Sequence, residues 1–204
     1  RELVNGASPS ELGQTWTFPA ASAPWTSTQW LSELILFWIH ELGGWTALAM
    51  LRVATAAACI AVLAHTTLRG RPKALAGFPF VVAVVAVCVA SQERPQQVTL
   101  VGAAVLGGTL VAGITRGHLP RWYLQVLGTL LWANLHGGWI LVPIVMGLIA
   151  AGRLLDHGLR DPLARRSAVL MVASVASGAV TPSGWAGVTA GVWFHEAAGA
   201  VVSE

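Results

Sequence analysis

The sequence is poor in charge. Only 10% of its 204 residues are Asp, Glu, Lys or Arg, whereas 55% are hydrophobic and the mean hydropathy is +0.65. Ordinary soluble domains carry about 25% charged residues. The shortage of charge therefore excludes an ordinary soluble domain and predicts that much of the chain is solvated by lipid.

Cysteine is scarce as well. Cys59 and Cys88, the two cysteines, each lie inside an apolar stretch, and neither belongs to a CxxC or Cys/His pattern that would hold a metal. We expect no cofactor. A divalent metal stays possible, although no motif indicates one.

Basic residues interleaved with aromatic ones are missing, so the isoelectric point near 9.5 does not indicate a nucleic-acid partner. Most cations instead form three clusters between apolar stretches. Such loops stay on the cytoplasmic side of a bilayer, which predicts a multi-pass membrane protein and also its orientation. The clusters are Arg69, Arg71 and Lys73; Arg116 and Arg121; and Arg153, Arg160, Arg165 and Arg166.

The fold class predicted is all-α, a polytopic transmembrane helical bundle with an outer interfacial helix and a broken pair of helices. A break is needed at 134–138, since one helix over 122–152 would put a basic cluster on the wrong side. Spans are expected at 45–65, 75–90, 98–114, 122–152 with its break, and 167–180.

The whole chain, 1–204, is interpreted as a single transmembrane domain. Residues 1–44 form an outer loop, 45–184 hold the spans, and 185–204, which lack basic residues, form an outer segment. Because the chain opens at Arg1 without Met or a signal peptide, we expect it to be part of a longer protein cut within an outer loop.

The outer loop contains one amphipathic helix. Thr26 and Gln29 have capping-box spacing, and Gly43-Gly44 predicts the end of the helix. Between them, over 27–42, polar residues share one face, opposite a face formed by Trp30, Leu31, Leu34, Ile35 and Trp38. This pattern indicates a helix lying at the outer interface, with its tryptophans as anchors or, alternatively, as sugar-stacking residues.

The orientation places most acidic and His residues on the outer side, where chemistry is expected. The inner loop 153–166 is interpreted as a solvated turn that fixes topology.

Several strings resemble, in the same order, those of bacterial multi-spanning proteins related to the GT-C class of glycosyltransferases. The most specific is Trp132-Ala133-Asn134-Leu135-His136-Gly137-Gly138. The others are Trp16-Thr17-Phe18-Pro19, Pro24-Trp25, Gln29-Trp30-Leu31-Ser32-Glu33, Gly43-Gly44, Arg94-Pro95-Gln96, and Thr181-Pro182-Ser183-Gly184, where Asn-Pro-Tyr-Gly is commoner.

The resemblance implies transfer of a sugar from a polyprenyl-phosphate donor at the extracytoplasmic face. In GT-C enzymes the carboxylate taken as general base usually lies just after the first spanning helix. This chain begins beyond that place, so we expect the fragment itself to be inactive and the full-length protein to be the enzyme.

The residues themselves supply candidates for such a site. A glycosyltransferase needs a carboxylate to take the acceptor proton and cationic groups for the phosphate. Glu33 and Glu41 are the catalytic candidates, each with the alternative of an interfacial carboxylate. The substrate-binding candidates are Arg52, Arg94, Asn134 and His136. Arg52 could instead snorkel to the interface, and Arg94 could form a surface ion pair with Glu93. For Asn134 and His136 the alternative is a role in helix packing.

The break at 134–138 is expected to line a polar cavity near Arg52 or Arg94. Partners are expected to be membrane lipid, the lipid-linked sugar donor and other membrane proteins. Two other functions stay open: a transporter, for which no inverted repeat is found, and a non-catalytic membrane scaffold or lipid-binding subunit of a larger complex.

Overall fold

The computed structural model describes residues 29–68, 73–92, 94–117, 119–185 and 188–189, and within these ranges the fold is all-helical, as predicted. The interpretations of 1–28, Glu93 and most of 185–204 lie outside the described residues. The described residues form six α-helices and one 3-10 helix: α1 (Trp30–Leu68), α2 (Lys73–Ala90), α3 (Gln96–Arg116), α4 (Trp122–Leu135), the 3-10 turn (Gly137–Ile140), α5 (Leu141–His157) and α6 (Pro162–Gly178).

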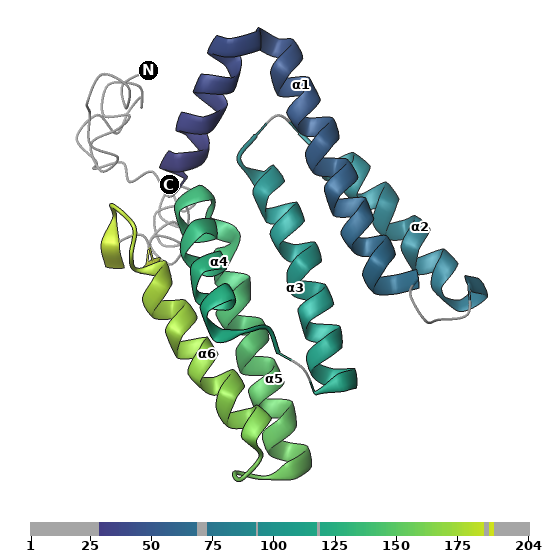
Figure 1. Ribbon diagram of the computed structural model, residues 1–204, viewed down its shortest axis with the longest axis vertical. Helices are drawn as coiled ribbons and strands as arrows, with labels where there is room; N and C mark the ends of the chain where they lie inside the picture. Colours follow the sequence, from purple (N-terminus) through teal and green to yellow (C-terminus); the bar gives the residue numbers. More distant parts are fainter. Residues whose placement is uncertain (1–28, 69–72, 93, 118, 186–187, 190–204) are drawn as a thin grey trace, which may run out of the picture.

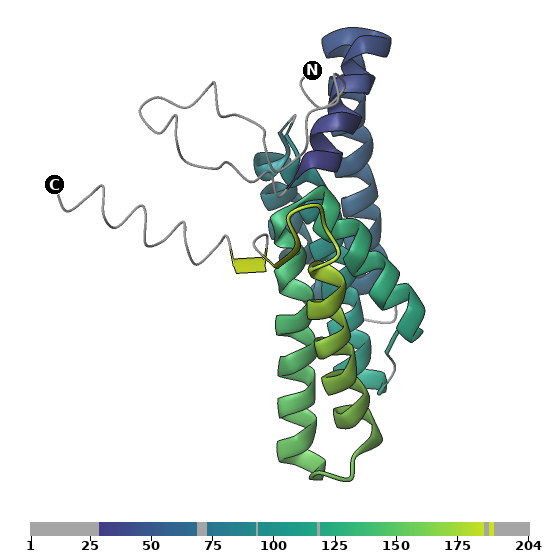
Figure 2. The same ribbon diagram turned by 90° about the vertical axis from the view of Figure 1, so that its left-hand side faces the viewer.

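Helix α1 is two helices joined at a sharp kink. Gly43 and Gly44 have non-helical backbone angles, and Gly44 has φ of +58°, which favours glycine. The predicted end of the first helix is thereby confirmed. The kink forms an apex that stands above the other helices in both Figure 1 and Figure 2.

The remaining helices run up and down beside one another (Figure 1). Helix α2 packs on the second part of α1, which packs on α3, whereas α4, α5 and α6 form a second group. Each group has its own core. Cys59, Val87 and Ala104 form the first core, and the second contains Trp132, Ala133, Trp139, Val142, Met146, Ile149 and Leu170, joined by Leu106 of α3.

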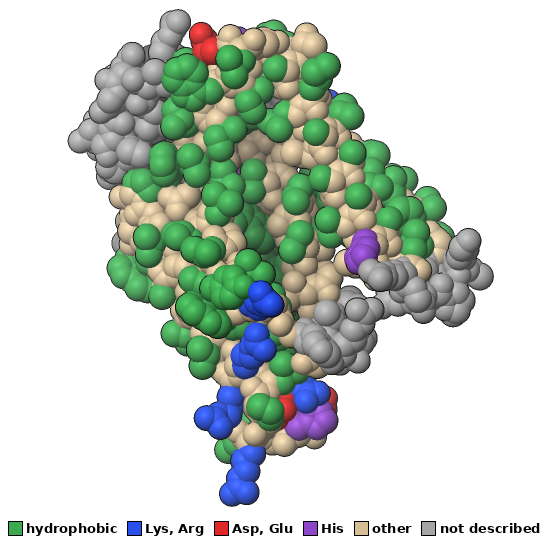
Figure 3. Space-filling model, viewed as in Figure 1, with side chains coloured by type: hydrophobic (Ala, Val, Ile, Leu, Met, Phe, Trp, Pro, Cys, Tyr) green, Lys and Arg blue, Asp and Glu red, His purple; other side chains and the backbone are tan. Residues whose placement is uncertain are grey.

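The two ends of the molecule differ in charge. Lys and Arg side chains gather at the lower end in Figure 3, where the α5–α6 turn and the start of α4 lie. We call this the basic end; its described members are Arg121, Arg153, Arg160, Arg165 and Arg166. The other end, which holds the turn between α4 and α5, is called the break end. The described cations of the second and third clusters thus share one end, as the charge pattern predicts.

Apolar side chains cover much of the surface (Figure 3). On α2, Phe78 is 79% exposed and Val89 is 75% exposed. Two described segments, Trp30–Thr66 and Gly137–His157, are long and apolar enough to cross a membrane. Helix α4, with 14 residues, extends only about 21 Å, less than the ~30 Å of a hydrocarbon core.

Candidate functional site

A break is present within the predicted range 134–138, but it is confined to His136, because Asn134 and Leu135 still belong to α4 and Gly137 begins a 3-10 turn. Helix α4 ends at Leu135, and His136 is fully extended, with φ of −163° and ψ of 146°. The chain then makes a 3-10 turn over Gly137–Ile140 and reverses into α5. The break is therefore the tip of a helical hairpin, which separates two short helices of opposite direction.

Three distant segments are hydrogen-bonded to this tip: the first turn of α1, the residues after α6 and the start of α3. From the first turn of α1, the Trp30 indole donates to Asn134 Oδ1 at 3.0 Å, and the Ser32 hydroxyl donates to the Leu135 carbonyl. From the other side, Asn134 Nδ2 donates to the Val180 carbonyl, just after α6, at 3.1 Å. Asn134 therefore joins α1 to the end of α6.

The ring of His136 is held by α3 and by its own turn. Thr99 Oγ1 lies 2.7 Å from Nδ1, and the Gly138 amide donates to the same nitrogen at 3.1 Å. Because Nδ1 accepts from an amide, it carries no proton, so the neutral ring bears its proton on Nε2. The Trp132 indole extends this series of hydrogen bonds by donating to Thr99 Oγ1 at 3.3 Å.

This tautomer limits what His136 can do. In the neutral ring Nε2–H is a donor, so it suits an anionic or carbonyl oxygen and does not suit proton abstraction. No described residue accepts a hydrogen bond from Nε2, and the side chain is partly exposed. His136 can therefore serve as a donor at the break end.

The structure separates the two carboxylates predicted as catalytic. Glu33 directly follows Ser32, at the contact with the break, and Gln29 Nε2 donates to it at 3.4 Å. Glu41 is exposed two turns further along α1, about 12 Å beyond Glu33 and next to the kink. Of the two carboxylates, only Glu33 lies in the turn of α1 that is hydrogen-bonded to the break.

The two predicted arginines form a second group. Arg52 is half-buried one turn before Thr55, whose hydroxyl lies 2.6 Å from Gln97 Oε1. Arg94 is exposed one turn before Gln97, whose amide donates to the Arg94 carbonyl at 3.1 Å. The start of α3 links the two groups, because Gln97 contacts α1 and Thr99 contacts His136.

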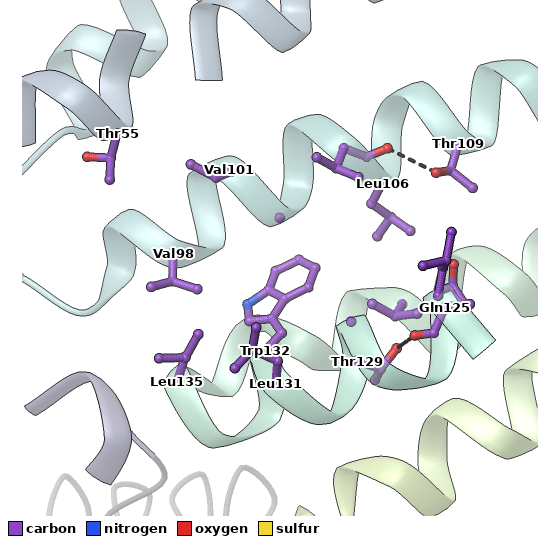
Figure 4. Close-up of a pocket in the computed structure, with 15 residues that line it drawn as sticks. Thr55, Val98, Val101, Leu106, Thr109, Gln125, Thr129, Leu131, Trp132 and Leu135 are labelled. Atoms are coloured by element: carbon purple, nitrogen blue, oxygen red, sulfur yellow. Dashed lines mark hydrogen bonds between the residues drawn. The ribbon is translucent and has the colours of Figure 1, made fainter. Parts of the chain in front are cut away.

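A groove that the described residues form beside the break is apolar, whereas a polar cavity is expected there. A groove of about 490 Å³ runs between α3 and α4, and none of the six predicted site residues lines it (Figure 4). The His136 ring is not part of the lining of the groove, because its Nδ1 contacts Thr99 and Gly138. Its lining comprises Thr55, Val98, Val101, Gly102, Val105, Leu106, Thr109, Leu124, Gln125, Gly128, Thr129, Leu131, Trp132, Leu135 and Val142.

The inner loop 153–166 is more than the solvated turn that the sequence suggested. Asp161 is buried, caps α6 by accepting from the Leu163 and Ala164 amides, and pairs with Arg153 Nε at 2.8 Å. The Arg153 hydrogen bond is the main reason that the pKa of Asp161 is lowered. A bond of 2.7 Å from Arg166 to the Pro120 carbonyl ties this loop to the start of α4.

Thr99 and Gln97 were missed by sequence reasoning. Both are polar residues in the first turns of an otherwise apolar helix, and that isolation was the one signal that could have identified them. Within the described residues no group of His, Cys, Asp and Glu could hold a metal ion.

Comparison of the chain with known protein families, with curated proteins and with solved structures finds no match.

Proposed function

We propose that this chain is the membrane-embedded part of a glycosyltransferase-like protein of the bacterial inner membrane, which uses a polyprenyl-phosphate-linked sugar at the extracytoplasmic face. The break end faces outward and the basic end faces the cytoplasm, because clustered cations stay inside. The helices cross the membrane together, but α4 is shorter than the hydrocarbon core, so the break lies within the membrane and opens toward the outside.

One observation carries the proposal. The first turn of α1, which carries Glu33, is hydrogen-bonded to the segment that carries Asn134 and His136, at the end opposite the described cationic clusters. They meet where helices end, so backbone and side-chain polar groups are concentrated there. Such a place suits a polar headgroup whose lipid tail stays in the membrane.

Roles follow from the chemistry of each group. Glu33, in place of the upstream carboxylate that the resemblance implies, accepts the proton of the acceptor hydroxyl. The hydroxyl oxygen bonds to the anomeric carbon of the sugar while the bond between that carbon and the phosphate oxygen breaks. The phosphate leaves with the bond electrons and is stabilised by Arg52 and Arg94. His136 Nε2–H donates to a sugar or phosphate oxygen, and Asn134 keeps the break in place.

The test is to compare Glu33→Gln with Glu41→Gln in the full-length protein. Sugar transfer from the polyprenyl-phosphate donor should fall about 10²–10⁴-fold in the first variant and stay near the wild-type rate in the second. Equal loss in both, or none in either, would contradict the assignment of Glu33. Donor binding, measured in parallel, should survive in both.

His136→Asn gives a second measurement. An Asn side-chain oxygen can still accept from the Gly138 amide, but the Nε2–H donor is gone. Transfer or donor binding should fall, while the same substitution at exposed His157, at the basic end, should change neither.

A non-catalytic lipid-binding subunit is the second candidate, favoured by the apolar lining of the groove. A full-length protein that binds polyprenyl phosphate or phospholipid without transferring sugar would support this function instead.

A further inference from the structure

We infer that the groove between α3 and α4 binds one acyl chain of an anionic phospholipid, whose headgroup lies at the basic end against Arg121 and Arg166. This inference rests on the proposed membrane location but not on sugar transfer.

The groove exists because α3 and α4 converge only near the break. There Thr99 holds both Trp132 and His136. Farther along, small residues leave the space open, since an added Cβ at Gly128 would meet nothing within 4 Å. Figure 4 shows Val98 and Leu135 near one end of the groove and Thr109 and Gln125 near the other. A flexible hydrocarbon chain suits such an apolar lining.

The length of the groove corresponds to one leaflet. It spans Val98–Thr109 on α3 and Leu124–Leu135 on α4, about 17 Å along each helix. Half of a hydrocarbon core is about 15 Å. An acyl chain that enters from one leaflet would fill the groove, whereas a much longer polyprenyl chain would extend beyond it.

The mouth at the basic end carries the marks of a headgroup level. Trp122 and Tyr123 are exposed neighbours at the start of α4, with ring centroids 6.0 Å apart, and Leu124 and Gln125, which line the groove, come next. Exposed Trp and Tyr of this kind sit at the membrane interface. The acyl chain would therefore enter directly above the headgroup region.

The charge at this mouth favours an anionic headgroup. Arg121 donates to the Tyr123 hydroxyl at 2.9 Å, and Arg166 donates to the Pro120 carbonyl, so both guanidinium groups are held beside the start of α4. Both are exposed, and each has further N–H donors. A phosphate between them would gain two charge-assisted contacts.

Quenching of tryptophan fluorescence by brominated lipid tests this inference, because Trp132 lines the groove. The chain is reconstituted in phosphatidylcholine vesicles that contain a small fraction of either phosphatidylglycerol or phosphatidylcholine with brominated acyl chains. The brominated phosphatidylglycerol should quench the fluorescence more strongly than the brominated phosphatidylcholine. The excess should be about the contribution of one tryptophan, Trp132, to the fluorescence of all ten. The excess should disappear in Trp132→Phe.

Two pairs of variants sharpen the result. Gly128→Leu should fill the groove and abolish the excess quenching, whereas Gly107→Leu, an exposed helical glycine that does not line the groove, should preserve it. Arg121→Gln combined with Arg166→Gln should abolish the excess as well, and Arg160→Gln, on the exposed α5–α6 turn, should leave it. Helicity by circular dichroism identifies any variant that fails to fold.

Equal quenching by the two brominated lipids would overturn the inference, as would an excess that Gly128→Leu does not reduce. Recovery of fluorescence on adding unlabelled phosphatidylglycerol supports the inference, and stronger recovery with the same fraction of polyprenyl phosphate overturns the choice of lipid. If no tryptophan is quenched by either lipid, the membrane location itself is wrong, which is a different failure from an empty groove.

Discussion

The two helical groups are built differently, although both are apolar. In α1–α3 the core consists of small residues such as Cys59 and Ala104, and most of the large side chains of α2 face outward. In α4–α6 two tryptophans and Met146 are buried, and the Arg153–Asp161 pair closes the hairpin at the basic end. The difference suggests that packing within α4–α6 is enough to stabilise that group, whereas the stability of α1–α3 depends on the medium around it.

The proposed membrane location would account for the stability of the looser group, because lipid would surround it. Between helices in a membrane, lipid tails are as apolar as the helices, so only close packing and hydrogen bonds favour association. Cross-helix hydrogen bonds in α1–α3 include Thr55–Gln97 and the weak contact of Cys59 Sγ with the Leu100 carbonyl at 3.5 Å. We therefore expect perturbations of α4–α6 to have the largest effects.

The largest effect is expected for Gly178→Ala. An added Cβ would lie 2.1 Å from the ring of Trp139, which is buried and has no room to move. The free energy of unfolding in detergent should decrease, and the decrease should lie near the upper end of the ~1–3 kcal/mol typical of overpacking. Gly152→Ala, where the Cβ meets nothing within 4 Å, should instead stabilise α5 by up to about 1 kcal/mol. Equal effects of the two substitutions would refute tight packing at Trp139.

The second-largest effect is expected at the contact between α1–α3 and α4–α6. Thr99→Val removes the hydroxyl between Trp132 and His136, leaves the indole N–H without its acceptor, and should cost about 1–2 kcal/mol of unfolding free energy. It should also make α1–α3 more accessible to hydrogen exchange than α4–α6. Thr109→Val is the control on the same helix, because Thr109 bonds only to the Val105 carbonyl of its own helix. Indistinguishable exchange patterns in the two variants would show that Thr99 does not join the groups.

The smallest effect is expected at the Arg153–Asp161 pair, which lies at the end of the bundle. Because the folded-state pKa of Asp161 is lowered, its carboxylate contributes stability above the unfolded pKa, near 3.9, and loses it as pH falls through the lowered folded value. Asp161→Asn keeps a capping oxygen but removes this dependence. Thermal unfolding midpoints of wild type and variant should therefore differ at about pH 7 and converge in strong acid. A constant difference at all pH values would contradict the role of the charge.

Local features of the fold were predictable from sequence because backbone chemistry decides them. The kink at Gly43-Gly44 and the break before Gly137-Gly138 lie where glycine pairs interrupt apolar runs. The placement of the described basic loops at one end also followed from charge spacing alone.

Only the tertiary structure decided which predicted site residues meet. It put the turn that carries Glu33 against the break and left Glu41 exposed near the kink, because the first residues of α1 bond to the tip of the α4–α5 hairpin. The pairing of Thr99 with His136 was equally hidden. Helix α3 is apolar on nearly every side, so its sequence does not show which face meets which neighbour. Sequence determined where the helices begin, break and end, whereas the rotation of each helix against its neighbours, set by packing between distant residues, determined the site and the groove.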